Sequence, residues 1–402
     1  MFLPLPQLAW DLIQEELQVL IASESCPSLA DGENFYNSGA GIYFQDIPSY
    51  NINESTVYRE YTKYYNKPNF LQIWLKKAFA GSSTNFARGN ADFDYFPNNP
   101  LSDGDCVGNE ESVKKATAYT GQLVESYQLV QKAIDSVQAG CYAQDDGCTD
   151  AIEAIDCAVA AYVGSGEGTE GNNSPTGDYG FGPYALADRR CRNFNTCGPT
   201  RDQTGPGGHL TAAVNAQIMS LFAAASHAAW LGDAALLEYY LRMISNKSII
   251  PLLQGVYRYY YRLSDEENGS GTFAIDDKYV GEGGTFAFGA LPKLYACSTR
   301  GVKKAEAQTL IGGGVAGVSA VDYQGLRLAF ECNYKCLGIT CEEVGSLYDG
   351  DPTPKPGAKK CDDEANGSVD VCDKPKKSRK QACKLYTGKP GVKDRDKLKF
   401  TF

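Results

Sequence analysis

The chain has 402 residues and a formal net charge of −11, with 49 Asp and Glu against 38 Lys and Arg. This length can bury a substantial core in one or two domains, and the acidic balance disfavours a nucleic-acid partner because phosphate backbones repel negative charge. The longest apolar stretch, near the start, is interrupted by Asp11, Glu15 and Glu16, so no transmembrane span is predicted.

Fourteen cysteines, none in a CxxC pair, are scattered along the chain, as a disulfide framework requires. Five Asn-x-Ser sequons accompany them, so N-glycans are expected at Asn53, Asn172, Asn246, Asn268 and Asn366. Both features predict an extracellular, periplasmic or cell-surface protein. The pairing of the cysteines does not follow from their spacing, and whether Cys157 is free stays open at this point.

Residues 1–25 predict an apolar N-terminal arm. Two prolines extend its first residues, and its apolar side chains then recur with helical spacing. The arm must cover this surface either on its own domain or in a groove of a neighbouring copy. The residues that would carry self-association are Phe2, Leu3, Leu5, Leu8, Trp10, Leu12 and Ile13.

The rest of the chain predicts a mainly α fold: a disulfide-stapled multi-helix domain with long loops over 26–350, followed by a basic, cysteine-containing tail over 351–402. A short β element is expected at the very end, where residues 397–402 alternate with period two. Pro251 is expected to kink or divide the helix that contains it. The expected helices span 56–80 in pieces, 111–139, 149–163, 209–231, 233–263, 304–318 and 322–335, and 165–208 is expected to be a long loop stapled by Cys191 and Cys197.

The common catalytic motifs are absent from the sequence. The chain has only two histidines, and it has no GxSxG, phosphate-loop or HExxH motif. His227 lies on a small-residue helix face and is expected in the core, while His209 suits a helix cap. Adjacent acids such as Glu342-Glu343 do not converge on one bond without a scaffold. The protein is therefore expected not to be an enzyme, with a carboxylate-based hydrolase as the least favoured alternative.

Oxygen donors are abundant, with 26 tyrosines in the chain. Tyr and Asp occur together in Arg88–Tyr95 and again in Asp178–Arg190. Ferric iron prefers carboxylate and phenolate oxygens, and an accompanying anion needs an arginine or a helix N-terminus beside the metal. The alternative reading of both clusters is a tyrosine-rich packed loop with Asp caps.

The same segments resemble the algal iron-assimilation (Fea-type) periplasmic proteins and the related diatom phytotransferrins. The resemblance covers about 55–225. Its segments are Tyr61–Tyr65, Trp74, Ala78–Gly81, Thr84–Phe86, Gly89–Phe93, Lys114-Lys115, Ala154–Asp156, Val159–Ser165, Tyr184–Cys191, Asn193-Phe194, Val214-Asn215 and Ile218.

The resemblance implies a secreted or surface, non-enzymatic protein that binds ferric iron with oxygen ligands, together with carbonate, and that meets an unidentified cell-surface receptor. From their residue types, we predict Asp92, Asp156, Tyr162, Tyr184 and Asp188 as metal ligands, with Arg189 and Arg190 for the anion. The chain departs from the family pattern at Glu153 and Cys157, where two side chains that could face a metal are replaced. The alternative is therefore a structural protomer of a glycosylated filament or coat, with a degenerate metal site.

Overall fold

The computed structural model describes residues 17, 20, 26–35, 57–98, 106–141, 149–164, 181–198, 211–264, 267, 276–309 and 321–362. Within these ranges the chain is helical, and the only β pairings are two isolated bridges, between Cys197 and Ala212 and between Ser264 and Val321. The prediction of a mainly α, disulfide-stapled fold is confirmed. The arm residues 1–16 and the end strand 397–402 lie outside the described residues, as do His209 and the sequons at Asn53, Asn172, Asn268 and Asn366. No described helix is long and apolar enough to cross a membrane.

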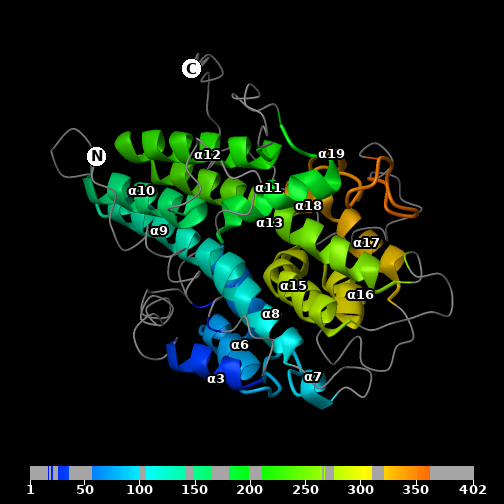
Figure 1. Ribbon diagram of the computed structural model, residues 1–402. Coiled ribbons are helices and arrows are strands. Elements are labelled where there is room, and N and C mark those ends of the chain that lie inside the picture. Colours follow the sequence, from blue (N-terminus) through cyan, green and yellow to red (C-terminus); the bar gives the residue numbers. More distant parts are fainter. Residues whose placement is uncertain are drawn as a thin grey trace, which may run out of the picture.

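Three long helices form the centre of the molecule (Figure 1). The first is a continuous rod of α8 (Val107–Lys115), the π-helix η2 (Ala116–Gly121) and α9 (Gln122–Gln138). The second is α13 (Ala234–Arg262), and the third is α15 (Asp277–Cys297), which packs against both α13 and α8. Most of the side chains of α15 are buried, so this helix is the core around which the others pack.

Two further layers cover this centre. On one side α10 (Thr149–Val163), α11 (Pro183–Phe194) and α12 (Ala213–Trp230) pack against α9 and α13. On the other side lie α3 (Cys26–Phe35), α5 (Tyr58–Tyr65), α6 (Phe70–Phe79) and α7 (Tyr95–Asn98). The tyrosines of α5 fasten it to α15: Tyr65 donates a hydrogen bond to the Phe288 carbonyl at 2.6 Å, and Tyr61 donates to the Gly289 carbonyl at 3.1 Å.

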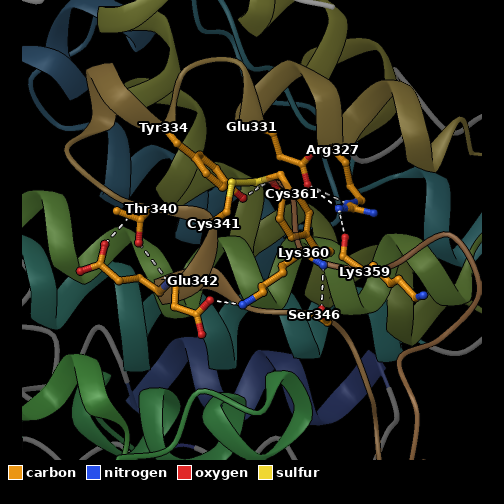
Figure 2. Close-up of a disulfide and its surroundings, with 12 residues drawn as sticks. Arg327, Glu331, Tyr334, Thr340, Cys341, Glu342, Ser346, Lys359, Lys360 and Cys361 are labelled. Atoms are coloured by element: carbon orange, nitrogen blue, oxygen red, sulfur yellow. Dashed lines mark hydrogen bonds and ion pairs between the residues drawn. A yellow bond between two sulfur atoms is a disulfide. The ribbon is translucent and has the colours of Figure 1, made fainter. Parts of the chain in front are cut away.

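The last part of the described chain folds onto α13 and α15. It comprises α16 (Thr299–Thr309), α17 (Tyr323–Glu331), α18 (Tyr334–Leu337), α19 (Cys341–Val344) and an irregular segment to residue 362. Figure 2 shows how the Cys341–Cys361 disulfide closes this segment, with Arg327 bonded to the Lys359 carbonyl and to Glu331. Residues 351–362 thus pack on the helical body, although the basic tail was expected to begin at 351.

Cysteine pairing supports the disulfide framework. Pairs join Cys191 to Cys197, Cys297 to Cys336 and Cys341 to Cys361, and Cys106, Cys141 and Cys332 are also disulfide-bonded. Cys157, whose state the sequence left open, is a free and half-buried thiol on α10.

The structure corrects four sequence expectations. His227, expected in the core, is exposed on α12, where its ring stacks on Trp230. Residues 183–194, expected in a long loop, form α11, which begins with Pro183 at its first turn and ends at Asn195 in a left-handed conformation. Pro251 does not divide α13, because packing of the buried middle of this helix outweighs one lost hydrogen bond. Helix α15 was not expected, because four glycines and Pro292 break its apolar pattern.

Candidate functional site

Three of the five predicted metal ligands come together around Asn215. The Tyr162 hydroxyl donates a hydrogen bond to Asn215 Oδ1 at 2.7 Å, and Asn215 Nδ2 donates to Asp188 Oδ1 at 2.8 Å and to the Tyr184 carbonyl at 3.0 Å. Asp188 Oδ1 also accepts from the Ala212 amide at 2.7 Å. These donors and acceptors satisfy one another, so the group ties α10, α11 and α12 together.

The other two predicted ligands do not join this group. Asp156 lies six residues before Tyr162 on α10, which places it on another face of that helix. Asp92 lies in the loop after α6 and accepts a hydrogen bond from the Ser83 hydroxyl at 2.8 Å. Among the described residues no three His, Cys, Asp or Glu side chains are grouped so as to hold a metal ion. The predicted ligands therefore do not fit a ferric ion as one set.

The two predicted anion-binding arginines point into the centre of the molecule. Arg189 donates to the Tyr119 hydroxyl at 3.4 Å. Arg190 is 7% exposed and donates to Asn193 Oδ1 and to the Tyr259 hydroxyl, each at 3.2 Å. Its guanidinium also lies over the rings of Tyr259 and Phe286, 5.3 and 5.2 Å from their centres. Both hydrogen bonds of this buried cation thus go to neutral acceptors.

Beside Arg190 is a group of buried charges that the sequence did not reveal. Lys115 Nζ lies 3.0 Å from Glu111 Oε2 and 3.1 Å from Glu282 Oε1. Both glutamates are almost fully buried. We call Glu111, Lys115, Arg190 and Glu282, with the phenols Tyr119 and Tyr259, the buried charge cluster; it draws on α8, η2, α11, α13 and α15.

Aromatic rings form one wall of the buried charge cluster. The ring of Phe286 stacks between Tyr119 and Tyr259, with centres 5.6 and 5.7 Å away. The Tyr259 hydroxyl accepts a second hydrogen bond, from Arg258 Nη1 at 3.1 Å, and Arg258 in turn binds Asp349 at 2.7 Å. The cluster is thereby connected to the segment after α19.

Local backbone features bring these side chains together. The π-helical turn after Lys115 is a feature found often at functional sites, and here it carries Tyr119. Helices α8 and α15 cross at two glycines: a Cβ on Gly281 would lie 2.3 Å from the Gly108 carbonyl oxygen. Only this close crossing allows Glu282, the next residue, to reach the Lys115 ammonium.

The charges of the cluster support one another. Burial disfavours the ammonium form of Lys115, but Glu282 and Glu111 outweigh it and hold its pKa well above the usual value. Burial likewise opposes ionisation of Glu111, yet Lys115 and Lys114 lower its pKa. Both side chains are therefore ionised at neutral pH. For Tyr259, burial is the main cause of a raised pKa, which Arg190 partly offsets.

The buried charge cluster has polar atoms left over. Within the described part of the chain, Glu282 Oε2 and Arg190 Nε are buried without a hydrogen-bond partner. A buried polar atom without a partner costs about 1–3 kcal/mol, and more when it is charged, so such atoms indicate a water or an ion. Two carboxylates and two phenols are the oxygen donors that hard cations prefer. The cluster can thus offer oxygen ligands to a ferric ion, provided that the Lys115 ammonium moves out from between the carboxylates.

Two sequence signals could have found this site. Glu110-Glu111 precedes Lys114-Lys115 by four residues, the spacing of ion pairs on a helix. Glu282 stands among glycines in an otherwise apolar run, which is unusual unless the charge has a buried partner. What could not be seen from the sequence is that α8 and α15 cross at this point.

The sequon at Asn246 lies in the interior. Asn246 is 5% exposed on α13, and its amide packs against Gly338, where an added Cβ would be 2.8 Å away. A glycan is bulky and needs the amide nitrogen in solvent. In the folded protein this position is not suited to carry one.

Comparison with family models, with curated proteins and with solved structures gives no match for this chain. The resemblance to the Fea-type proteins therefore stays a prediction.

Proposed function

We propose that the protein is a secreted or cell-surface, non-enzymatic protein that binds ferric iron through oxygen ligands, and that the buried charge cluster holds the ion. The observation that carries this proposal is the buried pair Glu111 and Glu282, which shares one lysine and leaves Glu282 Oε2 without a partner in the described structure. The phenols Tyr119 and Tyr259 would complete the oxygen donors. Arg190, whose hydrogen bonds go to neutral acceptors, would face the accompanying carbonate.

The disulfides agree with this location, because they persist in oxidising compartments. The acidic body, with 49 Asp and Glu, favours the approach of cations. Nothing in the proposal requires the predicted ligands Asp92 and Asp156.

Metal analysis of the natively purified protein tests the proposal. We expect about one ferric ion per chain, together with a visible tyrosinate-to-iron absorption band on loading. Glu282→Gln should reduce the bound iron at least tenfold, and Tyr259→Phe should weaken or shift the band. Absence of stoichiometric iron in the unmodified protein, after ferric loading in carbonate buffer, would contradict the proposal.

The chain offers a matched control on the same helix. Lys293 Nζ lies 2.5 Å from Glu60 Oε2, and both side chains are largely buried. Glu60→Gln removes one carboxylate from a buried lysine, just as Glu282→Gln does, but among the described residues no second carboxylate forms an ion pair with that lysine. Iron binding should survive Glu60→Gln. If both variants lose iron equally, the loss reflects general destabilisation and not the removal of a ligand.

A second candidate function is a structural protomer that assembles into a filament or coat. One observation favours it: Trp230 and Leu231, at the turn between α12 and α13, are 53% and 41% exposed. Large exposed apolar side chains that lie together suit a protein contact. Electron microscopy of the native material distinguishes the two functions, because fibres or sheets support assembly and discrete particles count against it.

A further inference from the structure

Exposed large apolar side chains occur at two places in the described residues. One place is the turn after α12, with Trp230 and Leu231; the other is Leu20, which is 37% exposed at the base of the N-terminal arm. Every other large apolar side chain of the described structure is at least partly covered. The arm and the α12 turn therefore share the same need for an apolar partner.

Helix α12 presents an unusual outer face. Its 18 residues include no Asp, Glu, Lys or Arg. The residues exposed along it are small or neutral, namely Ala216, Gln217, Ser220, Ala223, His227 and Trp230. The His227 ring stacks on Trp230 with centres 5.8 Å apart. On a chain with a net charge of −11, an uncharged helix face is a place where a second acidic copy can approach without repulsion.

The N-terminal arm has the matching chemistry. Its apolar residues from Phe2 to Ile13 precede Leu17, which is 1% exposed and belongs to the core. The arm is thus anchored at its base, and its first 16 residues must cover their apolar surface elsewhere. Its acidic side chains, Asp11, Glu15 and Glu16, lie between the apolar positions, so only one face needs a partner.

We propose that the N-terminal arm of one copy docks on the outer face of α12 of a second copy, with Trp230 and Leu231 as the centre of the contact. Reach favours a second copy. With the extended start and the helix that its sequence predicts, the arm of 16 residues spans about 35 Å, whereas a compact chain of this length is roughly 55 Å across. Figure 1 shows α3, which follows the arm, at the opposite end of the molecule from α12. Donor and acceptor surfaces differ, so each copy can accept one arm and donate another, which builds an open chain of copies.

A mixing experiment on metal-free protein tests this contact. One variant lacks residues 1–16 and keeps the acceptor; the other, Trp230→Ser with Leu231→Ser, keeps the arm and loses the acceptor. We expect each variant alone to be monomeric by light scattering and sedimentation, while the unmodified protein forms chains of copies. The two together should form a 1:1 heterodimer. Because both substituted side chains are largely exposed, the melting temperature should change little.

Gln138→Ser provides the control, since Gln138 is also exposed but lies at the end of α9, outside the outer face of α12. It should leave self-association within about twofold of the unmodified protein, whereas the acceptor variant should lose at least tenfold in association constant. An unmodified protein that stays monomeric, or two variants that fail to combine, would overturn the proposal. The latter result would show that the arm covers its own copy. Iron binding plays no part in these measurements, so their failure leaves the proposed iron site untouched.

Discussion

Helix α15 buries a charged side chain at each of two places, and the two places are built differently. Near its end, Lys293 meets one carboxylate, Glu60, at 2.5 Å. Three turns earlier, Glu282 meets Lys115, which already binds Glu111. At the first place one ammonium and one carboxylate bind each other directly, and we call Lys293 and Glu60 the closed pair for this mutual contact. The second joins two carboxylates through Lys115, with Lys278 Nζ a further 3.9 Å from Glu111 Oε1, and it lies beside an arginine whose hydrogen bonds go to neutral groups.

The comparison distinguishes buried charges that stabilise the fold from buried charges that can bind a ligand. In the closed pair the one carboxylate contacts the one ammonium, and removing either partner leaves the other charge buried without compensation. A cluster with carboxylate oxygens to spare loses less when one member is neutralised, because other members remain. Burial alone therefore does not mark a functional site; spare donors and acceptors do.

Asp188 shows a third way in which this protein accommodates a buried charged side chain. Its carboxylate is buried against neutral donors, the Ala212 amide and the Asn215 side chain. Burial is the main cause of its raised pKa, which is about 6, and these hydrogen bonds only partly offset it.

The largest expected effect is at the closed pair. Glu60→Gln should lower the free energy of unfolding by about 3–5 kcal/mol, because it leaves the Lys293 ammonium buried without its anion. Denaturation in urea measures this. Replacing both residues by apolar ones, Glu60→Leu with Lys293→Met, should restore most of the loss, and a double variant as unstable as the single one would contradict the closed-pair description.

The next effect is a pH dependence that comes from Asp188. Its folded pKa of about 6 exceeds the usual value of 3.8, so the folded state binds the proton more tightly. This contribution to stability is therefore full at low pH and is lost as the pH rises from about 4 to about 6, by up to about 3 kcal/mol. Asp188→Asn should remove that slope, since an amide oxygen can still accept both hydrogen bonds. If the free energy of unfolding of Asp188→Asn falls with pH as steeply as that of the unmodified protein, the prediction is wrong.

A smaller loss is expected at the helix crossing. Gly281→Ala would place its Cβ 2.3 Å from the Gly108 carbonyl oxygen, so α8 and α15 must move apart. We expect about 1–3 kcal/mol of destabilisation from this overpacking, together with weaker iron binding because Glu282 moves away from Lys115. Urea denaturation and iron titration check both parts. A variant that loses stability and keeps full iron affinity would show that the crossing does not position the cluster.

The smallest expected stability change is at the cluster itself. Glu282→Gln should lower the free energy of unfolding by about 1–2 kcal/mol, less than Glu60→Gln, because Lys115 keeps Glu111 as its partner. Measuring both variants under one set of conditions ranks them directly. The reverse order would mean that Glu282, and not Glu60, belongs to the closed pair.

Much of the fold followed from local patterns. The helix expected over 149–163 coincides with α10, and the break at Leu231-Gly232-Asp233 separates α12 from α13. Helix α15 was missed because its glycines lower helix propensity, and they are there for close packing: Cβ atoms at Gly281 and Gly283 would meet Gly108 and Tyr260. Propensity is local, whereas the reason for these glycines lies on other helices.

The candidate site was only partly predictable. Residue type drew attention to Arg190, which lies in the buried charge cluster, and Tyr162 and Asp188 come together through Asn215. The glutamates that share Lys115 lie 171 positions apart (282 − 111 = 171), and no spacing rule connects such residues. Carboxylates and phenols can be picked out from the sequence, but which of them are already satisfied by neighbouring amides is decided by tertiary contacts alone.

Because Asn246 lies in the interior, packing of α13 and glycosylation of this residue exclude each other. Once α13 packs, the amide lies against Gly338 and is closed to a transferase. A glycan attached beforehand would keep α13 from its place beside residues almost a hundred positions later in the chain. Occupancy of this single sequon, measured by mass spectrometry, therefore reports whether folding or glycosylation comes first.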